Sequence, residues 1–223
     1  MLYQLIFLDI PLYESQQERR LHMQQINNET KNKNTKKEFK VKDAIMVFSS
    51  FALMCVAVIF VLVSSEVLPM KRFLSFNNFS LMIMEVAAAS SGLVLFGIVL
   101  AVFTPSRYID ETNKSYQNGS LLGIVIFMFL AALFEELLFR GIIQNVFSVF
   151  IEQQWTAIII TTLLFLAFHT QYFKKPVMLL NISIPSLIFG WIYIETSNIL
   201  APFLVHFIMN VGMTLLFKHR LLT

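Results

Sequence analysis

Apolar and polar residues are distributed unevenly along the chain. Residues 14–43 are rich in Gln, Asn, Lys and Glu, and six lysines fall between Lys31 and Lys42. From Ala44 onward, long apolar runs alternate with short polar stretches. About 20 helical residues cross the hydrocarbon core of a bilayer, which is roughly 30 Å thick. The pattern therefore predicts a polar segment followed by several membrane-spanning helices.

Six spans are expected. The first two, over residues 44–65 and 81–103, contain Glu85 as their one acidic side chain. The third begins near Leu121 and continues through Glu135, Glu136 and Arg140. The last three cover residues 155–169, 177–194 and 199–217. The sequence therefore predicts an all-α polytopic fold in three parts, namely a basic N-terminal segment (1–43), two spans with their loops (44–119) and a C-terminal core (120–218).

Composition and charge narrow the class of protein. The chain is 57% hydrophobic and 14% charged, whereas a soluble domain has about 25% charged residues. A soluble enzyme is therefore excluded. The net charge of +3 does not indicate nucleic acid, because the basic residues stand between apolar spans. With the N-terminus inside, fourteen of the 17 Lys and Arg residues lie on the cytoplasmic side. This bias predicts that both termini are cytoplasmic.

The third span carries three charged residues, and a charge at mid-bilayer costs about 2.5–3.5 kcal/mol on insertion scales. Glu136 and Arg140 are four residues apart, so they share one helical face and can form an ion pair. Glu135 points about 100° away from Glu136 on a helix. It is therefore free to act as a general base.

A helical hairpin is expected to bring Glu135 near His169. Glu135 lies 17 residues before Glu152, at the turn, and His169 lies 17 residues after it. If residues 121–150 form one helix, the two side chains reach a similar depth. That helix would be long, so it must tilt, bend near Gly141 or protrude.

Two further pairs have helical spacing. His206 and Asn210 are four residues apart, so one face presents an imidazole and a carboxamide. Both groups can donate hydrogen bonds to an oxyanion, and neither needs a charge to do so. Phe165 lies four residues before His169 and can fix the rotamer of its ring.

Three motifs occur in order within these spans. Residues 134–141 have the pattern Glu-Glu-x-x-x-Arg, residues 165–169 have Phe-x-x-x-His, and residues 206–210 have His-x-x-x-Asn. Together they resemble the CPBP family of intramembrane proteases. That family includes the eukaryotic CAAX prenyl endopeptidase and bacterial members called Abi or bacteriocin-immunity proteins. The resemblance covers residues 120–218, which it identifies as a CPBP-like protease core.

The resemblance implies a membrane endopeptidase that hydrolyses a peptide bond with a glutamate-activated water. It implies that Glu135 activates the water, with His169 beside it, and that His206 and Asn210 stabilise the oxyanion. Supporting roles fall to Glu136, Arg140 and Phe165. No cofactor is expected, and the alternative is zinc bound by Glu135, His169 and His206, a ligand set known from catalytic zinc sites.

The expected partners are the lipid bilayer and a peptide precursor or membrane protein as substrate, with no nucleic acid. The expected location is the bacterial cell membrane, and the oligomeric state stays open. Two other functions remain possible at this point. One is a non-catalytic membrane partner of the same fold, conferring bacteriocin immunity or acting as a scaffold. The other is a small proton-linked transporter, although no internal repeat supports it.

Overall fold

The computed structural model describes the backbone of residues 10–104, 120–219 and 221, and their side chains except those of residues 10–16 and 29–41. Residues up to Ala44 and residues from Ile45 onward form two separate compact units. The first unit is helical from Ile10, and side chains 17–28 are exposed. Arg107, Lys114 and Arg220, on which the orientation partly rests, lie outside the described residues.

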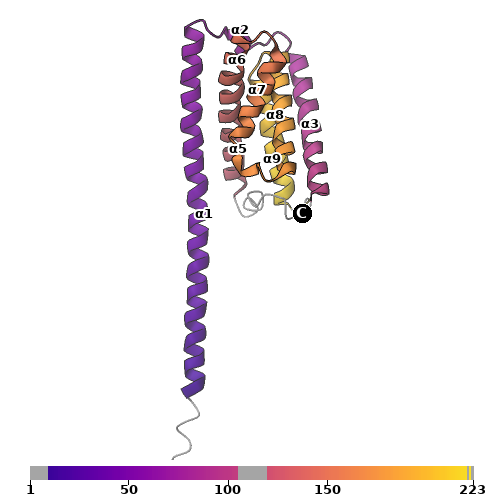
Figure 1. Ribbon diagram of the computed structural model, residues 1–223. Helices are drawn as coiled ribbons and strands as arrows, with labels where there is room; N and C mark the ends of the chain where they lie inside the picture. Colours follow the sequence, from indigo (N-terminus) through magenta and orange to yellow (C-terminus); the bar gives the residue numbers. More distant parts are fainter. Residues whose placement is uncertain (1–9, 105–119, 220, 222–223) are drawn as a thin grey trace, which may run out of the picture. The chain divides into compact units, whose positions relative to one another are not determined.

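Helices joined by short turns make up most of the described part of the chain, and this part contains no strand, which confirms the all-α prediction. Among the described residues, five helices are long and apolar enough to cross a membrane, and the apolar helix over Gln154–Ala167 is shorter. Figure 1 shows the helices of the second unit running side by side. The elements are α1 (Ile10–Ser64), α2 (Met70–Phe73), α3 (Phe79–Phe103), α5 (Leu121–Glu136), η3 (Leu137–Gln144), α6 (Asn145–Phe150), α7 (Gln154–Ala167), η4 (Thr170–Tyr172), α8 (Pro176–Thr196) and α9 (Leu200–Lys218).

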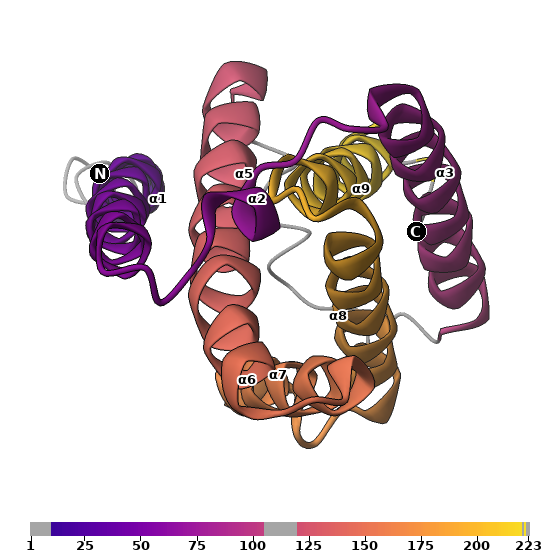
Figure 2. The same cartoon turned by 90° about the horizontal axis from the view of Figure 1, so that it is seen from above.

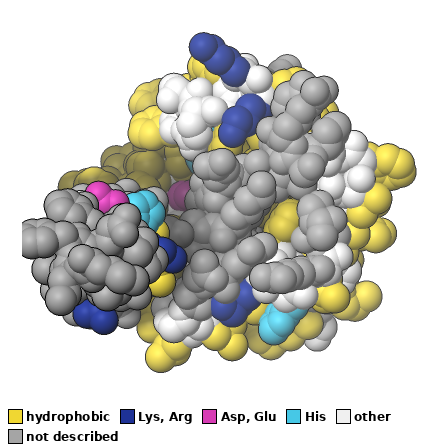
Figure 3. Space-filling view, turned by 90° about the horizontal axis from the view of Figure 1, so that it is seen from below, with side chains coloured by type: hydrophobic (Ala, Val, Ile, Leu, Met, Phe, Trp, Pro, Cys, Tyr) yellow, Lys and Arg dark blue, Asp and Glu magenta, His cyan; other side chains and the backbone are white. Residues whose placement is uncertain are grey.

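Helix α9 is central to the second unit. It packs against α3, α5 and α8, and α8 packs against α7 as well (Figure 2). The outward faces of the helices expose large apolar side chains, among them Met84, Leu122 and Leu163. Figure 3 shows hydrophobic side chains around the rim of one end, with Lys and Arg side chains also on that face. Such a surface suits contact with hydrocarbon, because the helical backbone satisfies its own polar groups.

The third predicted span is a helical stretch of 30 residues, Leu121–Phe150. Its middle, Leu137–Gln144, is π-helical and contains Gly141. A π-helix shifts its hydrogen bonds to the i→i+5 pattern, so carbonyls at its ends need other donors. The side-chain amide of Asn145 supplies them, because its Nδ2 lies 3.1 Å from the carbonyl oxygen of Arg140 and 3.0 Å from that of Gly141. The Asn145 side chain therefore supplies a donor to two carbonyls of the π-helical segment.

The turn between α8 and α9 is fastened to the segment after α2. The main-chain N–H of Ser75 donates to the carbonyl of Ser197, and that of Ile199 donates to the carbonyl of Phe73. Asn198, fully buried, donates from Nδ2 to the carbonyl of Ser75 at 2.7 Å. These bonds fix where α9 begins, and therefore where His206 and Asn210 lie along it.

Close packing at Gly190 gives a test of this arrangement. A Cβ atom at Gly190 would lie 2.9 Å from Cγ2 of Ile158 and 3.0 Å from Oε1 of Gln144. We expect Gly190→Ala to lower the melting temperature of the detergent-solubilised protein by roughly 2–10 °C, because α7 and η3 must move. Gly92→Ala is the matched control, since nothing lies within 4 Å of its added Cβ. An equal loss in both variants would contradict the packing.

Candidate active site

A partly open cavity of about 310 Å³ lies within the second unit. Four of its lining residues are those predicted to be catalytic, Glu135, His169, His206 and Asn210. They come from α5, from the turn after α7 and from α9, so only the packing of these helices brings them to one cavity. The rest of the lining is mostly apolar, with Phe and Met side chains predominating.

The adjacent glutamates have different surroundings, as their 100° separation on the helix requires. The Glu136 side chain is 0% exposed, and Glu135 is 20% exposed and faces the cavity. Oε1 of Glu136 accepts a hydrogen bond from Nη1 of Arg140 at 3.1 Å. The ion pair predicted from their spacing is therefore present.

Arg140 is fully buried and is held from several sides. Its Nη2 donates to both the carbonyl oxygen and the hydroxyl of Ser186, at 2.7 and 2.8 Å. The guanidinium carbon lies 5.5 Å from the ring centroid of Phe165 and 5.4 Å from that of Phe189. Cation–π contacts of this kind stabilise a desolvated cation. The ion pair with Glu136 therefore belongs to a larger buried cluster that also includes Ser186, Phe165 and Phe189, which we call the buried framework.

His206 connects this framework to the cavity. Its Nδ1 lies 2.7 Å from Oε1 of Glu136 and donates to it, and its Nε2 lies 3.8 Å from Oε2 of Glu135. The imidazole also stacks on Phe189, with ring centroids 4.8 Å apart and an interplanar angle of 21°. The proton on Nδ1 makes the hydrogen bond to Glu136. A neutral His206 therefore has no proton on Nε2, the ring nitrogen that faces the cavity. The expectation that His206 donates to an oxyanion without charge does not suit this arrangement.

His169 lies outside the helix in which the sequence placed it. Helix α7 ends at Ala167, and His169 precedes the 3-10 turn η4. Its main-chain N–H donates to the carbonyl of Leu166, and its side-chain Nδ1 donates to the carbonyl of Phe165 at 2.7 Å. The side chain thus satisfies a carbonyl left over at the helix end. This bond and the contact with the Phe165 ring, 4.5 Å between centroids, orient the imidazole.

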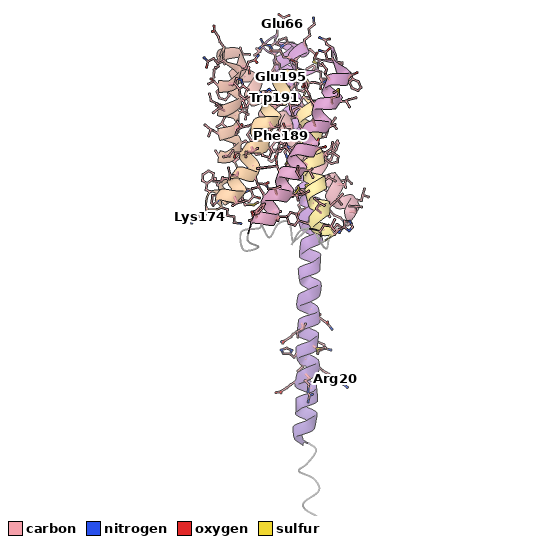
Figure 4. The ribbon with its side chains drawn as sticks, turned by 90° about the vertical axis from the view of Figure 1, so that its right-hand side faces the viewer. Arg20, Glu66, Lys174, Phe189, Trp191 and Glu195 are labelled. Carbon is pink, nitrogen blue, oxygen red and sulfur yellow. The ribbon has the colours of Figure 1, made fainter. Side chains whose placement is uncertain are left out.

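Asn210 lies one turn after His206 on α9, is half-buried and lines the cavity. Glu135 interacts electrostatically with both histidines. Figure 4 places Phe189, the ring that stacks on His206, between the end marked by Glu66 and Glu195 and the end marked by Lys174. The reactive groups therefore lie at depth among the helices.

No motif in the sequence pointed to Ser186 or Phe189, which contact Arg140 and His206. Both lie on α8, 46 residues or more from their polar partners in the third span, and no motif includes them. The one available signal was Ser186 itself, a small polar residue next to Pro185 inside an apolar span.

The zinc alternative needs three ligands close together. Within the ranges that the structure describes, no group of three or more His, Cys, Asp or Glu side chains is arranged to hold a metal ion. Glu135, His169 and His206 do line one cavity, but they are not such a group as they stand. Zinc binding by these three residues stays a prediction.

A comparison with known proteins covers the part of the chain that contains the four predicted catalytic residues. Residues 117–212 match a family model described as Rce1-like, type II CAAX prenyl endopeptidase. The matched segment contains all three motifs. No solved structure matches the chain significantly.

Two relatives match about half of the chain. One is described as uncharacterized protein YpbD of Bacillus subtilis, 28% identical over 121 residues, which are 53% of this chain and 59% of the relative. Another, an uncharacterized 24.3 kDa protein of Escherichia coli, is 37% identical over 120 residues, 52% of this chain and 53% of the relative. The chain spans a little over half the length of each. Over residues 117–212, which contain the three motifs, the chain is similar to the Rce1-like family of type II CAAX prenyl endopeptidases.

Proposed function

We propose that the chain is an intramembrane endopeptidase that hydrolyses a peptide bond with a water activated by Glu135. The observation that carries this proposal is one cavity lined by Glu135, His169, His206 and Asn210 in a mostly apolar setting. The substrate is a peptide precursor or a membrane protein. The protein lies in a bacterial cell membrane with both termini in the cytoplasm, as the distribution of Lys and Arg supports.

The geometry near Glu135 suits a bound water. Oε2 of Glu135 and Nε2 of His206 lie 3.8 Å apart, so one water can stand about 2.8 Å from both. Glu135 takes a proton from this water while the oxygen bonds to the substrate carbonyl carbon. The proton then passes from Glu135 to the leaving nitrogen as the carbon–nitrogen bond breaks. No covalent enzyme intermediate forms, and no step passes through a metal.

The oxyanion needs hydrogen-bond donors. The carboxamide of Asn210 donates without any change of charge. His206 donates from Nε2 in its doubly protonated form, because Nδ1 is already committed to Glu136. His169 offers Nε2 to the cavity, since its Nδ1 is committed to the Phe165 carbonyl. In this proposal His169 orients the water or the leaving group.

The extent of the cavity lining indicates where a peptide can enter. The lining extends to Thr104 at the end of α3, Val177 near the start of α8 and Phe217 near the end of α9. All three lie at the end of the helices that carries Lys174 and Lys218. In the proposed orientation this end is cytoplasmic, so the peptide enters from that side.

Replacement of Glu135 tests the proposed base. We expect Glu135→Gln to lower cleavage by roughly 10²–10⁴-fold at matched expression, because Gln keeps the shape but cannot take the proton. Cleavage of peptides by native membranes, read by mass spectrometry, measures it. Glu85→Gln is the control, since Glu85 is half-buried on α3 and does not line the cavity. Full activity of Glu135→Gln would instead favour a non-catalytic membrane partner.

The buried framework can be tested separately from the chemistry. We expect Arg140→Met to destabilise the protein by about 3–5 kcal/mol, because the Glu136 carboxylate is left buried without its cation. Thermal unfolding in detergent measures this. Adding Glu136→Gln removes the stranded charge and should restore part of the stability. No recovery in the double variant would mean that the ion pair is not what the single variant disrupts.

The role of Asn210 separates turnover from binding. We expect Asn210→Ala to lower kcat by roughly 10²–10³-fold with little change in KM, since oxyanion contacts strengthen in the transition state. Steady-state kinetics with a cleaved peptide measures both constants. A raised KM with normal kcat would assign Asn210 to substrate binding instead.

A further inference from the structure

One face of α8 lines the cavity beyond the catalytic cluster. It includes Asn181, Ile182, Pro185 and Phe189, spaced so that they share a side of the helix. Asn181 alone among these four has a polar side chain. It is half-buried, and no described residue forms a hydrogen bond with its amide. A carboxamide that lines a mostly apolar cavity, with no hydrogen-bond partner among the described residues, is available to a ligand.

The backbone beside Asn181 is also unusual. Pro185 lies inside α8 and has no main-chain N–H. The helical hydrogen bond that residue 185 would give to the carbonyl of Asn181 is therefore missing. Because both residues line the cavity, this main-chain acceptor and the carboxamide lie on the same side of α8. Together they offer donors and acceptors, which is what the alternating N–H and C=O groups of an extended peptide need.

The position of Asn181 relative to the reactive groups follows from helix geometry. Phe189 stacks on His206 and so marks the level of the proposed chemistry. Asn181 precedes Phe189 by eight residues, which is about 12 Å along a helix at 1.5 Å per residue. An extended peptide advances about 3.3 Å per residue. Asn181 therefore lies three to four substrate residues from the scissile bond, toward the end of the cavity where α8 begins.

Hydrogen bonds to η3 hold α8 at a defined position along the helix axis, so the distance from Asn181 to the reactive groups is defined as well. Ser186 is bound to Arg140 through its carbonyl and hydroxyl, and the carbonyl of Gly190 accepts from Nε2 of Gln144 at 3.0 Å. All three bonds join α8 to η3, directly after Glu135 and Glu136. Asn181 is thus held at a set distance from the proposed base.

We propose that Asn181 is a substrate-positioning residue. Its carboxamide, together with the main-chain carbonyl that loses its regular helical donor at Pro185, binds the main chain of an extended peptide three to four residues from the bond that is cut. This inference rests on the proposed endopeptidase function. It adds a requirement that catalysis alone does not make, namely a minimum length of peptide on one side of the scissile bond.

The experiment uses the purified full chain in detergent and a library of synthetic apolar peptides, with cleavage read by mass spectrometry. A cleaved peptide is then shortened one residue at a time from each end. We expect Asn181→Leu to raise KM roughly three- to tenfold for the long peptide and to leave kcat within about twofold. For peptides shortened by enough residues on one side, wild type and variant should have the same KM.

Two further variants sharpen the test. Pro185→Ala gives residue 185 an N–H that can donate to the Asn181 carbonyl. In this single variant too, KM for the long peptide should be higher than in wild type. Ser183→Ala is the matched control on the same helix, because Ser183 is not among the residues lining the cavity. It should leave both constants unchanged.

The outcomes separate this inference from the proposed function. An unchanged KM in Asn181→Leu, or an equal loss at every peptide length, overturns the positioning role while leaving the endopeptidase intact. If wild type cleaves no peptide, or Glu135→Gln cleaves as well as wild type, the proposed function fails and the positioning role falls with it.

Discussion

The arrangement of this protein depends on a buried ion pair. Glu136 and Arg140 are both fully buried, and an unpaired charge at such a place is too costly to keep in a membrane. Each therefore needs partners from other helices. Arg140 takes Ser186 and two aromatic rings on α7 and α8, and Glu136 takes Nδ1 of His206 on α9. The requirement to satisfy two charges thus determines how three helices meet around the third span.

The two histidines of the cavity are oriented in the same way by different acceptors. Nδ1 of His206 donates to a carboxylate, and Nδ1 of His169 donates to a main-chain carbonyl at the end of α7. In both rings this leaves Nε2 for the cavity. The orientation of a histidine is therefore fixed by a partner that does not itself contact the substrate. In the proposed reaction, this means that the geometry of Glu136 matters as much as that of Glu135.

Departures from regular helix occur in this protein where the backbone is buried or lines the cavity. The π-helical segment Leu137–Gln144 is buried over much of its length, and the Asn145 side chain donates a hydrogen bond to the carbonyl of Arg140 within it. Pro185, which interrupts the hydrogen bonding inside α8, lines the cavity, and His169 follows the end of α7. Main-chain groups without helical partners cannot face lipid, but they can face protein or a polar cavity. Irregular backbone and polar chemistry are thus found together.

Features that depend on neighbours along one helix could be predicted from the sequence. The apolar runs predicted the spans, the four-residue spacing of Glu136 and Arg140 predicted their ion pair, and adjacency predicted that Glu135 would point elsewhere. Tertiary structure alone decided the contacts between helices, such as His206 with Glu136, 70 residues away, and Ser186 with Arg140. It also decided that α7 ends before His169 and that Asn181 faces the cavity. Helix geometry fixes local spacing for any sequence, whereas the rotation and depth of one helix against another depend on the packing of all of them at once.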